Sequence, residues 1–396
     1  MKGFAVPIVV VMAAAAMACA PRARVSVPIG ELSPVNAAPP PDAGSAWRTP
    51  AERDRATRAA IATPTRTAPR VGVHVEPLSR SSGTVSYLDF EDIAPETVNE
   101  SPSAEMLRSD RGPVVLRAQV LLDRANFSVG VIDGFLGKNT ELAIYWFQYS
   151  QNLPVTGALD TVTYNRLASV AGTDHIIGSV VLDREMLKGP FVTIPQNVYA
   201  QAELRCLCYS SPLEALAERF HTTEDILRKL NPKTEFSSVA VDDVIRTPSV
   251  DHPVDPEQKP IVRIHISKTG NYVQALAADG SIVLHFPSTL GSLYDPSPDG
   301  SYDVTAIARD PTFRYDPTLF SDVPDTKPRA ELPPGPNSPV GTVWIALSKE
   351  HVGIHGTPTP ETIGWASSHG CVRLTNWDAQ RLADATSEGI PVEFVF

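Results

Sequence analysis

Hydrophobic residues recur at helical spacing in two parts of the chain and at strand spacing in a third. The first helix-spaced set is Val115, Ala118, Leu121, Leu122 and Ala125, and the second is Leu213, Leu216, Ala217 and Phe220. Short apolar or alternating runs follow at 260–266, 272–277, 282–286, 343–347 and 392–396. Helical spacing indicates amphipathic helices, and alternation indicates half-buried strands. The pattern therefore predicts two small helix-containing modules followed by a mostly β domain.

Glycines and prolines between these patterns set the expected domain boundaries in the chain of 396 residues. A small three-helix module is expected at 112–172, a small α+β module at 190–249 and the mostly β domain at 260–396. Within the β domain, about 295–339 is dense in Pro, Asp and Gly. Because a long irregular segment inside a compact domain is usually functional, we expect a loop or lid beside a site there.

The N-terminal part has the features of an export signal followed by a tether. A basic start at Lys2 precedes an apolar run that is too short to span a membrane and fits a secretory signal over 1–19. Residues 16–19 resemble a bacterial lipobox, which implies lipidation of Cys19, although Ala18-Cys19-Ala20 also fits ordinary signal cleavage. Residues 20–111 are rich in Pro and Ala without an apolar period, which predicts a disordered tether. We expect an exported protein of the periplasm or cell envelope that touches the membrane only through this lipid.

Composition narrows the range of partners. The chain has 34 Lys and Arg against 45 Asp and Glu, a net charge of −11. This balance argues against nucleic acid as a partner, because phosphate binding needs clustered positive charge. Four cysteines are too few for a scaffold built on disulfides. The 37 prolines are about twice the usual share of roughly 5%, as an unpacked segment would require.

The turns of the first module carry a recognisable motif. Apolar positions between Thr140 and Phe147 mark a second helix, and Asp160 or Thr161 is placed to cap a third. The motif residues are Gln119, Asp133, Gly134, Gly137, Thr140, Ala143, Phe147, Gln148, Gly157, Leu159, Asp160 and Thr163. This pattern resembles the peptidoglycan-binding type 1 module, and the resemblance implies attachment to the cell wall. Each of these residues, taken alone, is expected to be structural.

The second module resembles a LysM-like glycan-binding unit. After its helix stripe, residues 222–225 offer a cap and an acidic first turn for a second helix, which Asn231-Pro232 ends. Residues 239–241 and 244–245 are expected to form a strand pair. An ordinary small α+β linker domain is the alternative interpretation.

Cys206 and Cys208 are separated by one residue, and their role is ambiguous. In an oxidising compartment the two thiols could form a small-ring disulfide. Metal binding would need more ligands than this neighbourhood supplies. No catalytic role is expected for the pair.

Another cysteine, in the β domain, has the neighbours of a nucleophile. Cys371 follows His369 by two positions and His355 by sixteen, and an imidazole can take the proton of an attacking thiol. The glycines and prolines between them allow the chain to fold back. The amides of Gly370 and Cys371 are candidate oxyanion donors, and Arg373 can hold a carboxylate. Zinc is the competing chemistry, but neither a CxxC nor an HExxH framework is present, so no metal is expected.

These residues resemble the L,D-transpeptidase (YkuD) family, whose signature is a His-Gly segment followed by Ser-His-Gly-Cys-x-Arg. Residues 332–341 are also similar to the family's "LPPG…NPLG" run. The resemblance implies a YkuD-like β-sandwich with Cys371 as nucleophile and His355 as general base and acid. It assigns the substrate pocket and oxyanion site to Ser368, His369, Gly370 and Arg373. For His369, a structural hydrogen bond that holds the cysteine loop is the alternative.

The same resemblance implies a reaction that needs no cofactor. Cys371 would attack the carbonyl between the diamino acid and the terminal D-alanine of a tetrapeptide stem and form a thioester. The side-chain amine of a second stem would then accept the acyl group, which gives a 3→3 crosslink. The expected partners are stem peptides and glycan strands. Water as acceptor would give a carboxypeptidase or hydrolase, and a lysine of an envelope lipoprotein would give protein anchoring. A wall-binding protein without activity is the rival class.

Overall fold

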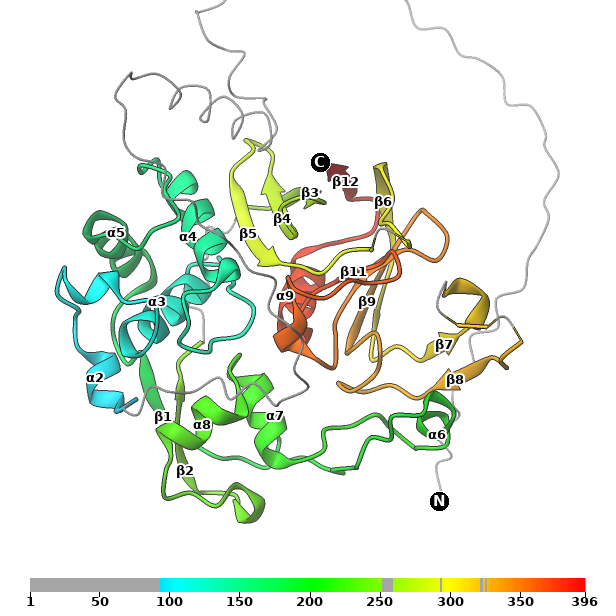
Figure 1. Cartoon of the computed structure of the whole chain (residues 1–396), viewed down its shortest axis with the longest axis horizontal. Helices are drawn as coiled ribbons and strands as arrows, with labels where there is room; N and C mark the ends of the chain where they lie inside the picture. Colours follow the sequence, from blue (N-terminus) through cyan, green and yellow to red (C-terminus); the bar gives the residue numbers. More distant parts are fainter. Residues whose placement is uncertain (1–92, 251–258, 293, 321–322, 325, 396) are drawn as a thin grey trace, which may run out of the picture. The chain divides into compact units, whose positions relative to one another are not determined.

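The computed structural model describes residues 93–250, 259–292, 294–320, 323–324 and 326–395 (Figure 1). The predicted signal over 1–19, with Cys19, and the first part of the predicted tether lie outside these residues. In the described part of the chain, no helix has both the length and the apolar character that a membrane span requires.

The last part of the predicted tether is folded. Residues 93–111 contain the helices α2 (Pro95–Asn99) and η1 (Met106–Arg108). Val98 and Leu107 are buried in the core of the first module, and the Arg117 guanidinium donates to the Val98 carbonyl at 3.0 Å. The extension of the tether to residue 111 is therefore wrong. Two helical pieces this short have no apolar period that the sequence could reveal.

The first module has the three predicted helices, α3 (Pro113–Arg124), α4 (Lys138–Ser150) and α5 (Thr161–Ala171). The Asp160 side chain caps α5, because it accepts from the Thr163 amide at 2.7 Å. This settles the predicted choice between Asp160 and Thr161 as the cap.

Two buried glutamines hold the glycine turns between these helices. The Gln119 Oε1 atom accepts from the amides of Asp133 and Gly134. In the same way, the Gln148 Oε1 atom accepts from the amides of Thr156 and Gly157. The glutamines of the motif are thus structural, as predicted, because each satisfies backbone groups of a turn that has no ladder partner.

The second module contains three α-helices, a short 3-10 helix and a strand pair. Its elements are β1 (Ile177–Val181), α6 (Val198–Ala202), α7 (Pro212–Arg219), α8 (Glu224–Leu230), η2 (Phe236–Ser238) and β2 (Val244–Pro248). The expected pairing of 239–241 with 244–245 is wrong, since β2 pairs antiparallel with β1. Residues 239–243 form a turn in which the Asp243 carboxylate accepts from the Ala240 amide at 2.8 Å. Upstream of α7, Cys206 and Cys208 form a disulfide.

Eight strands of the C-terminal domain form one sheet. They are β3 (Ile261–Ser267), β4 (Tyr272–Ala277), β5 (Ile282–Pro287), β6 (Gly300–Arg309), β9 (Val343–Leu347), β10 (Gly353–His355), β11 (Val372–Arg373) and β12 (Pro391–Val395). Their order is β11-β10-β9-β6-β12-β3-β4-β5. All five strands predicted from the apolar runs are therefore confirmed.

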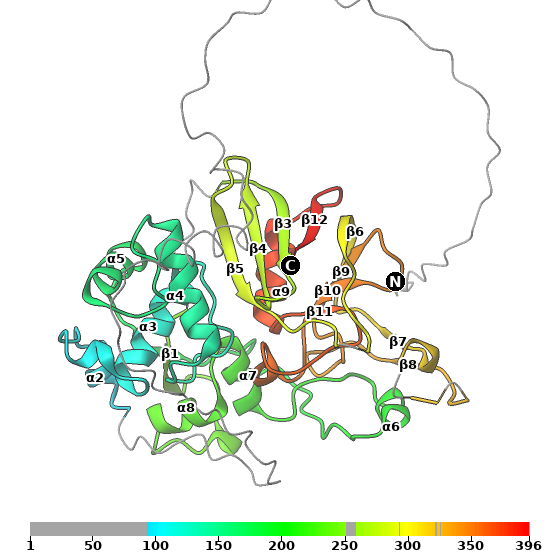
Figure 2. The same ribbon diagram turned by 45° about the horizontal axis from the view of Figure 1, so that its top comes forward.

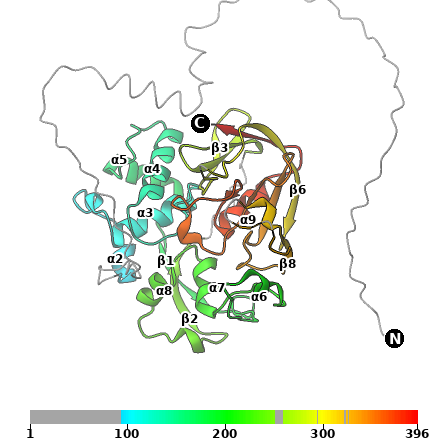
Figure 3. The same ribbon diagram turned by 45° about the vertical axis from the view of Figure 1, so that its right-hand side comes forward.

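The long strand β6 joins two halves of this sheet. Its first residues pair with β12, and its later residues pair with β9. The resemblance implied a β-sandwich, but the strands form one continuous, curled sheet because β6 belongs to both halves. The helix α9 (Asn376–Ala385) lies against the curled sheet (Figure 3). Its apolar face, with Leu382, packs into the core that both halves share.

The stretch expected to be irregular, 295–339, contains β6 and the small pair β7 (Phe313–Tyr315) and β8 (Ala330–Leu332). Two short helices, η3 (Pro317–Leu319) and η4 (Pro360–Thr362), lie in loops of the domain. The strand β6 escaped prediction because most of its side chains are exposed and only Val304 is buried. Its place is fixed by backbone pairing on both sides rather than by an apolar face.

The first module is packed against the edge strand β5, with α4 beside it (Figures 1 and 2). The His285 amide donates to the Asn126 carbonyl, and the Ser128 amide donates to the His285 carbonyl, both at 2.9 Å. The Trp146 ring lies 5.2 Å from that of Tyr272, between ring centroids. These contacts cover an edge that would otherwise expose unpaired backbone groups.

Buried charged groups join all three modules behind this edge. The Arg381 guanidinium donates to the Asp123 carboxylate at 3.1 Å, and His221 Nδ1 lies 3.1 Å from the same carboxylate. Asp378 of α9 accepts from the Ser128 hydroxyl at 2.9 Å. Burial raises the pKa of Asp378 to about 7. Each module thus contributes a side chain to one hydrogen-bonded network.

Candidate active site

Three of the candidate residues, His355, Cys371 and Arg373, lie on one face at the β11 end of the curled sheet. His355 and Arg373 are register partners on the parallel strands β10 and β11, so their side chains point to the same side. Cys371 directly precedes β11 and therefore shares that side with Arg373, since alternate residues of a strand face the same way. Ile354 and Val372 point to the opposite side, into the apolar core. The fold thus brings together the histidine and the cysteine that the sequence separates by sixteen positions.

His355 is held in one neutral tautomer. Its Nδ1 atom lies 2.7 Å from the Gly356 carbonyl oxygen, and because a carbonyl can only accept, Nδ1 carries the proton. The side chain is 4% exposed. Burial, with a smaller contribution from the positive charge of Arg373, lowers the pKa of His355 to about 3. At neutral pH the Nε2 atom is therefore unprotonated and able to accept a proton.

Cys371 is the one cysteine of the described residues outside a disulfide, and it is half-buried. Its Sγ atom lies 3.5 Å from the His351 carbonyl oxygen, to which the thiol donates. Burial raises the pKa of the Cys371 thiol, while a hydrogen bond from the Gly353 backbone and the charge of Arg373 oppose that effect. At rest the Cys371 thiol and the His355 imidazole are thus both neutral.

Ser368 and Gly370 shape the backbone that carries the cysteine. The Ser368 hydroxyl donates to the Cys371 carbonyl at 2.5 Å and accepts from the Gly370 amide at 3.2 Å. The Gly370 amide, which the sequence suggested as an oxyanion donor, is thus bonded to Ser368 in this structure. Gly370 has a φ of +106°, a conformation that side chains other than glycine rarely adopt.

The side chains of His369 and Arg373 have different neighbours. The His369 ring packs edge-on against Phe320 at 4.9 Å between centroids, and its Nε2 atom lies 4.0 Å from the Asp295 carboxylate. His369 therefore contacts the segment predicted to be a loop beside the site. The Arg373 Nε atom is buried and has no hydrogen-bond partner within the described part of the chain. Burial lowers the pKa of Arg373.

Two residues of this site were missed by sequence reasoning. The Trp344 ring stacks on His355 at 5.3 Å between centroids, and a Cβ on Gly353 would lie 2.6 Å from the same indole. Thr289 exchanges two backbone hydrogen bonds with Arg373, at 2.9 and 3.0 Å. Trp344 was contained in a predicted strand, but nothing in its spacing indicated contact with His355.

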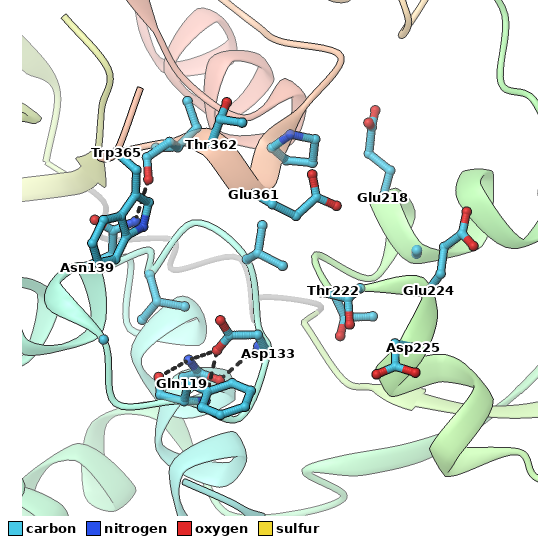
Figure 4. Close-up of a pocket in the computed structure, with 18 of the residues that line it drawn as sticks. Gln119, Asp133, Asn139, Glu218, Thr222, Glu224, Asp225, Glu361, Thr362 and Trp365 are labelled. Carbon is cyan, nitrogen blue, oxygen red and sulfur yellow. Dashed lines mark hydrogen bonds between the residues drawn. The ribbon is translucent and has the colours of Figure 1, made fainter. Parts of the chain in front are cut away.

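A cavity of about 1140 Å³ lies next to this site rather than around it (Figure 4). One wall is the segment 358–366, which belongs to the chain between His355 and Cys371. The facing walls come from the first and second modules and include Asn139 and Glu218. Burial is the main cause that raises the pKa of Glu218 to about 7. The described residues contain no cluster of His, Cys, Asp and Glu suited to a metal ion.

Family comparisons agree with both motifs. Residues 261–394 match the YkuD family model, described as "L,D-transpeptidase catalytic domain". Residues 111–167 match a model described as "Putative peptidoglycan binding domain". The chain thus contains an L,D-transpeptidase catalytic domain and a peptidoglycan-binding domain.

Curated relatives carry the same enzyme name. The "Putative L,D-transpeptidase YkuD" of Bacillus licheniformis is 29% identical over 46% of this chain and 91% of the relative. Its counterpart in Bacillus subtilis is 25% identical over 46% of this chain and 91% of that protein. The "Probable L,D-transpeptidase YbiS" of Escherichia coli is 38% identical over 17% of this chain and 21% of that protein. The protein is an enzyme of the L,D-transpeptidase type.

Solved structures of L,D-transpeptidases are also similar to the chain. One, from Xylanimonas cellulosilytica, covers 75% of this chain and 99% of its own with a TM-score of 0.34 and 14% identity. L,D-transpeptidase 3 from Mycobacterium tuberculosis covers 40% of this chain and 76% of its own with a TM-score of 0.29 and 19% identity.

Proposed function

We propose that the protein joins peptidoglycan stems by cysteine acyl transfer, with Cys371 as nucleophile and His355 as general base and acid. The acyl donor would be the diamino acid of a tetrapeptide stem, released from its terminal D-alanine, and the acceptor would be the side-chain amine of a second stem. The product is a 3→3 crosslink. The observation that carries this proposal is the neutral His355 imidazole with its free Nε2 atom on the same sheet face as the Cys371 thiol.

The protonation states on this face suit the first step. As the Cys371 Sγ atom attacks the stem carbonyl, its proton moves to His355 Nε2, and the imidazolium then protonates the departing amine of D-alanine. The thioester carbonyl is next attacked by the acceptor amine, which gives its proton to the same Nε2 atom, and the thiol re-forms as the amide is released. Both steps conserve protons without any other titratable group.

Other residues of the face supply charge and shape. The unpaired Nε atom of Arg373 suits a carboxylate of the stem peptide, because a guanidinium binds carboxylates through a planar fork. With the Gly370 amide bonded to Ser368, the Cys371 amide is left as the oxyanion donor of this loop. Ser368 and His369 would act by fixing the loop on which the cysteine lies.

The remaining modules would hold the enzyme at its substrate. The peptidoglycan-binding domain supports cell-wall attachment, and the β1-α7-α8-β2 arrangement of the second module is compatible with a LysM-like glycan-binding unit. A wall substrate requires export, in keeping with the predicted signal over 1–19 and lipidation of Cys19. Lipid attachment and a periplasmic location are part of this proposal.

The proposal is tested with purified enzyme and isolated sacculi, followed by muropeptide analysis. Wild-type protein should produce 3→3 dimers. The Cys371→Ala variant should lose at least about 1000-fold of this activity, because removal of a nucleophile removes the covalent step. The His355→Ala variant should lose about 100- to 10,000-fold, the usual range for a general base.

The control is His351→Asn, which retains the backbone carbonyl that the thiol contacts and tolerates the left-handed φ of 62° at this position. It should keep wild-type activity, and all variants should bind sacculi equally. Crosslinking that persists in Cys371→Ala would refute the assignment, as would a carbapenem adduct mapped to another residue. Free tripeptides as the main product would show that water is the acceptor. Protein-linked muropeptides would show that a protein lysine is the acceptor.

A further inference from the structure

Two side chains from outside the chain between His355 and Cys371 form hydrogen bonds with its backbone at residues 362–364. The Thr362 carbonyl accepts from the Thr289 hydroxyl at 3.3 Å and the Gly364 amide donates to the same hydroxyl at 3.0 Å. Between them, the Ile363 carbonyl accepts from the Asn139 side-chain amide at 2.9 Å (Figure 4). We call residues 362–364 the catalytic-segment anchor.

One of the two side chains that hold this anchor belongs to the peptidoglycan-binding domain. Asn139 is the second residue of α4, and its side chain takes no part in capping that helix. The contact is close, since a Cβ on Gly364 would lie 2.4 Å from the Asn139 Oδ1 atom. Gly364 also has a φ of +85°, a backbone conformation that side chains other than hydrogen rarely allow.

The anchor is connected to the active-site face through Thr289. The same residue that holds Thr362 and Gly364 by its hydroxyl exchanges backbone hydrogen bonds with Arg373. The next residue, Leu290, accepts at its carbonyl from the Ser368 amide at 2.8 Å. A displacement of the anchor would therefore act on the strand of Arg373 and on the loop of Cys371.

The domain that carries Asn139 is itself held rigidly against the catalytic sheet. Backbone hydrogen bonds join Asn126 and Ser128 to β5. Arg381 and Asp123 form a buried, charge-assisted hydrogen bond between the two domains. Tyr272 of the sheet belongs to the apolar core of the peptidoglycan-binding domain. Asn139 thus extends from a support that cannot easily move relative to the sheet.

From this geometry we propose that Asn139 is a positioning residue for acyl transfer, and that through it the peptidoglycan-binding domain sets the placement of the catalytic segment. Asn139 acts through the Ile363 carbonyl and does not touch substrate. The proposal rests on the proposed function, because it assumes that Cys371 and His355 carry the reaction. Small displacements of reacting groups slow a reaction strongly even when the displaced group lies away from the chemistry.

The test compares Asn139→Ala and Asn139→Asp with Glu141→Gln in the full chain. Aspartate keeps the shape of asparagine but places an oxygen opposite the Ile363 carbonyl, so both variants lose the hydrogen bond. Glu141 is exposed on the same helix and serves as the matched control. For the two Asn139 variants we expect kcat to fall about tenfold or more with KM changed less than twofold, and the rate of carbapenem acylation of Cys371 to fall in parallel.

Sacculus binding and Tm separate positioning from other effects. Both should match Glu141→Gln, because a purely structural role would lower Tm and a wall-binding role would lower sacculus binding. Values of kcat equal to the control, a loss confined to KM, or a loss of activity that follows Tm or sacculus binding would each overturn the proposal. If Cys371→Ala remains active, the proposed function fails instead, which is a different result from an inactive Cys371→Ala with unaffected Asn139 variants.

A double-mutant cycle with Thr289→Val provides a second test. Valine keeps the shape of the buried threonine and removes the hydroxyl that bonds to Thr362 and Gly364. Since Asn139 and Thr289 hold the same anchor, their effects on log kcat should be less than additive, as for residues that share a partner. Full additivity would show that the two act independently and would contradict the proposal.

Discussion

The imidazole of His355 and the thiol of Cys371 are both neutral at rest, and the cause is the same for each. Burial on the sheet face lowers the pKa of His355 to about 3 and raises the pKa of Cys371. Arg373 lowers both values, because its positive charge disfavours imidazolium and favours thiolate. Since the pKa of the base lies far below that of the thiol, no thiolate–imidazolium pair forms before substrate arrives.

This pairing predicts the pH dependence of cysteine alkylation. Below a raised pKa the thiolate fraction increases tenfold per pH unit, so iodoacetamide should modify Cys371 about tenfold faster for each unit between pH 6 and 8.5. Mass spectrometry of the Cys371 peptide gives the rate. His355→Ala should show the same slope, because a neutral imidazole does not stabilise the thiolate. A plateau reached below pH 7 would indicate an ion pair and contradict the assignment of states.

The reactive side chains of the active site could be identified from the sequence, but the residues that contact them could be identified only from the fold. Cys371 and His355 were predictable because both lie in short motifs with flanking glycines. Trp344, Thr289 and Asn139 were not, since each contacts the site through pairing or packing between segments far apart in the chain. The bond between Gly370 and Ser368 depends on a local turn geometry that spacing does not specify.

Among the elements, the three helices of the first module were predicted from the sequence, whereas the helix α9 and the central strand β6 were not. The helices of the first module bury a clear stripe, so periodicity was sufficient, and Asp160 marked a start. The strand β6 lies between β9 and β12 but buries little of its side-chain surface. A strand that is held mainly by backbone hydrogen bonds cannot be recognised from the pattern of apolar residues. For the same reason β1, the partner of β2, lay outside the range predicted for the second module.

The turn held by Gln148 offers a test at this scale. Gln148 is fully buried, and its Oε1 atom accepts from two backbone amides that have no ladder partner. Gln148→Leu would remove the acceptor of both partly buried amides and the donor that bonds to the buried Thr163 hydroxyl, a loss of about 1–3 kcal/mol in total. We therefore expect the free energy of unfolding to fall by about 2 kcal/mol, with a lower Tm in calorimetry. The partly exposed Gln151→Leu is the control, and equal Tm values for the two variants would contradict a structural role for the motif glutamine.

On the scale of the whole molecule, the three modules are less separable than their sequence motifs suggest. Each motif could be identified alone, because each is local. The contacts between modules could not, since they combine an edge strand, a buried charge network and a shared core that no single segment encodes. The sequence thus predicted a chain of independent units, whereas β5 and Tyr272 are completed by the peptidoglycan-binding domain.

This integration predicts that the catalytic domain depends on the domain before it. A fragment of residues 259–396 would expose the backbone of β5 and the ring of Tyr272, and an open edge with adjacent apolar surface favours aggregation. It would also leave Asp378 and Arg381 of α9 without Ser128 and Asp123, and buried polar groups that lose their partners cost stability.

We expect this fragment to be largely insoluble or to unfold well below the Tm of a chain that starts at residue 93. That longer chain keeps every one of these contacts and serves as the control. Expression yield, size-exclusion chromatography and thermal unfolding measure the difference. A monomeric 259–396 fragment with the Tm and kcat of the control would show instead that the peptidoglycan-binding domain is a separable attachment, and that the catalytic face needs none of its contacts.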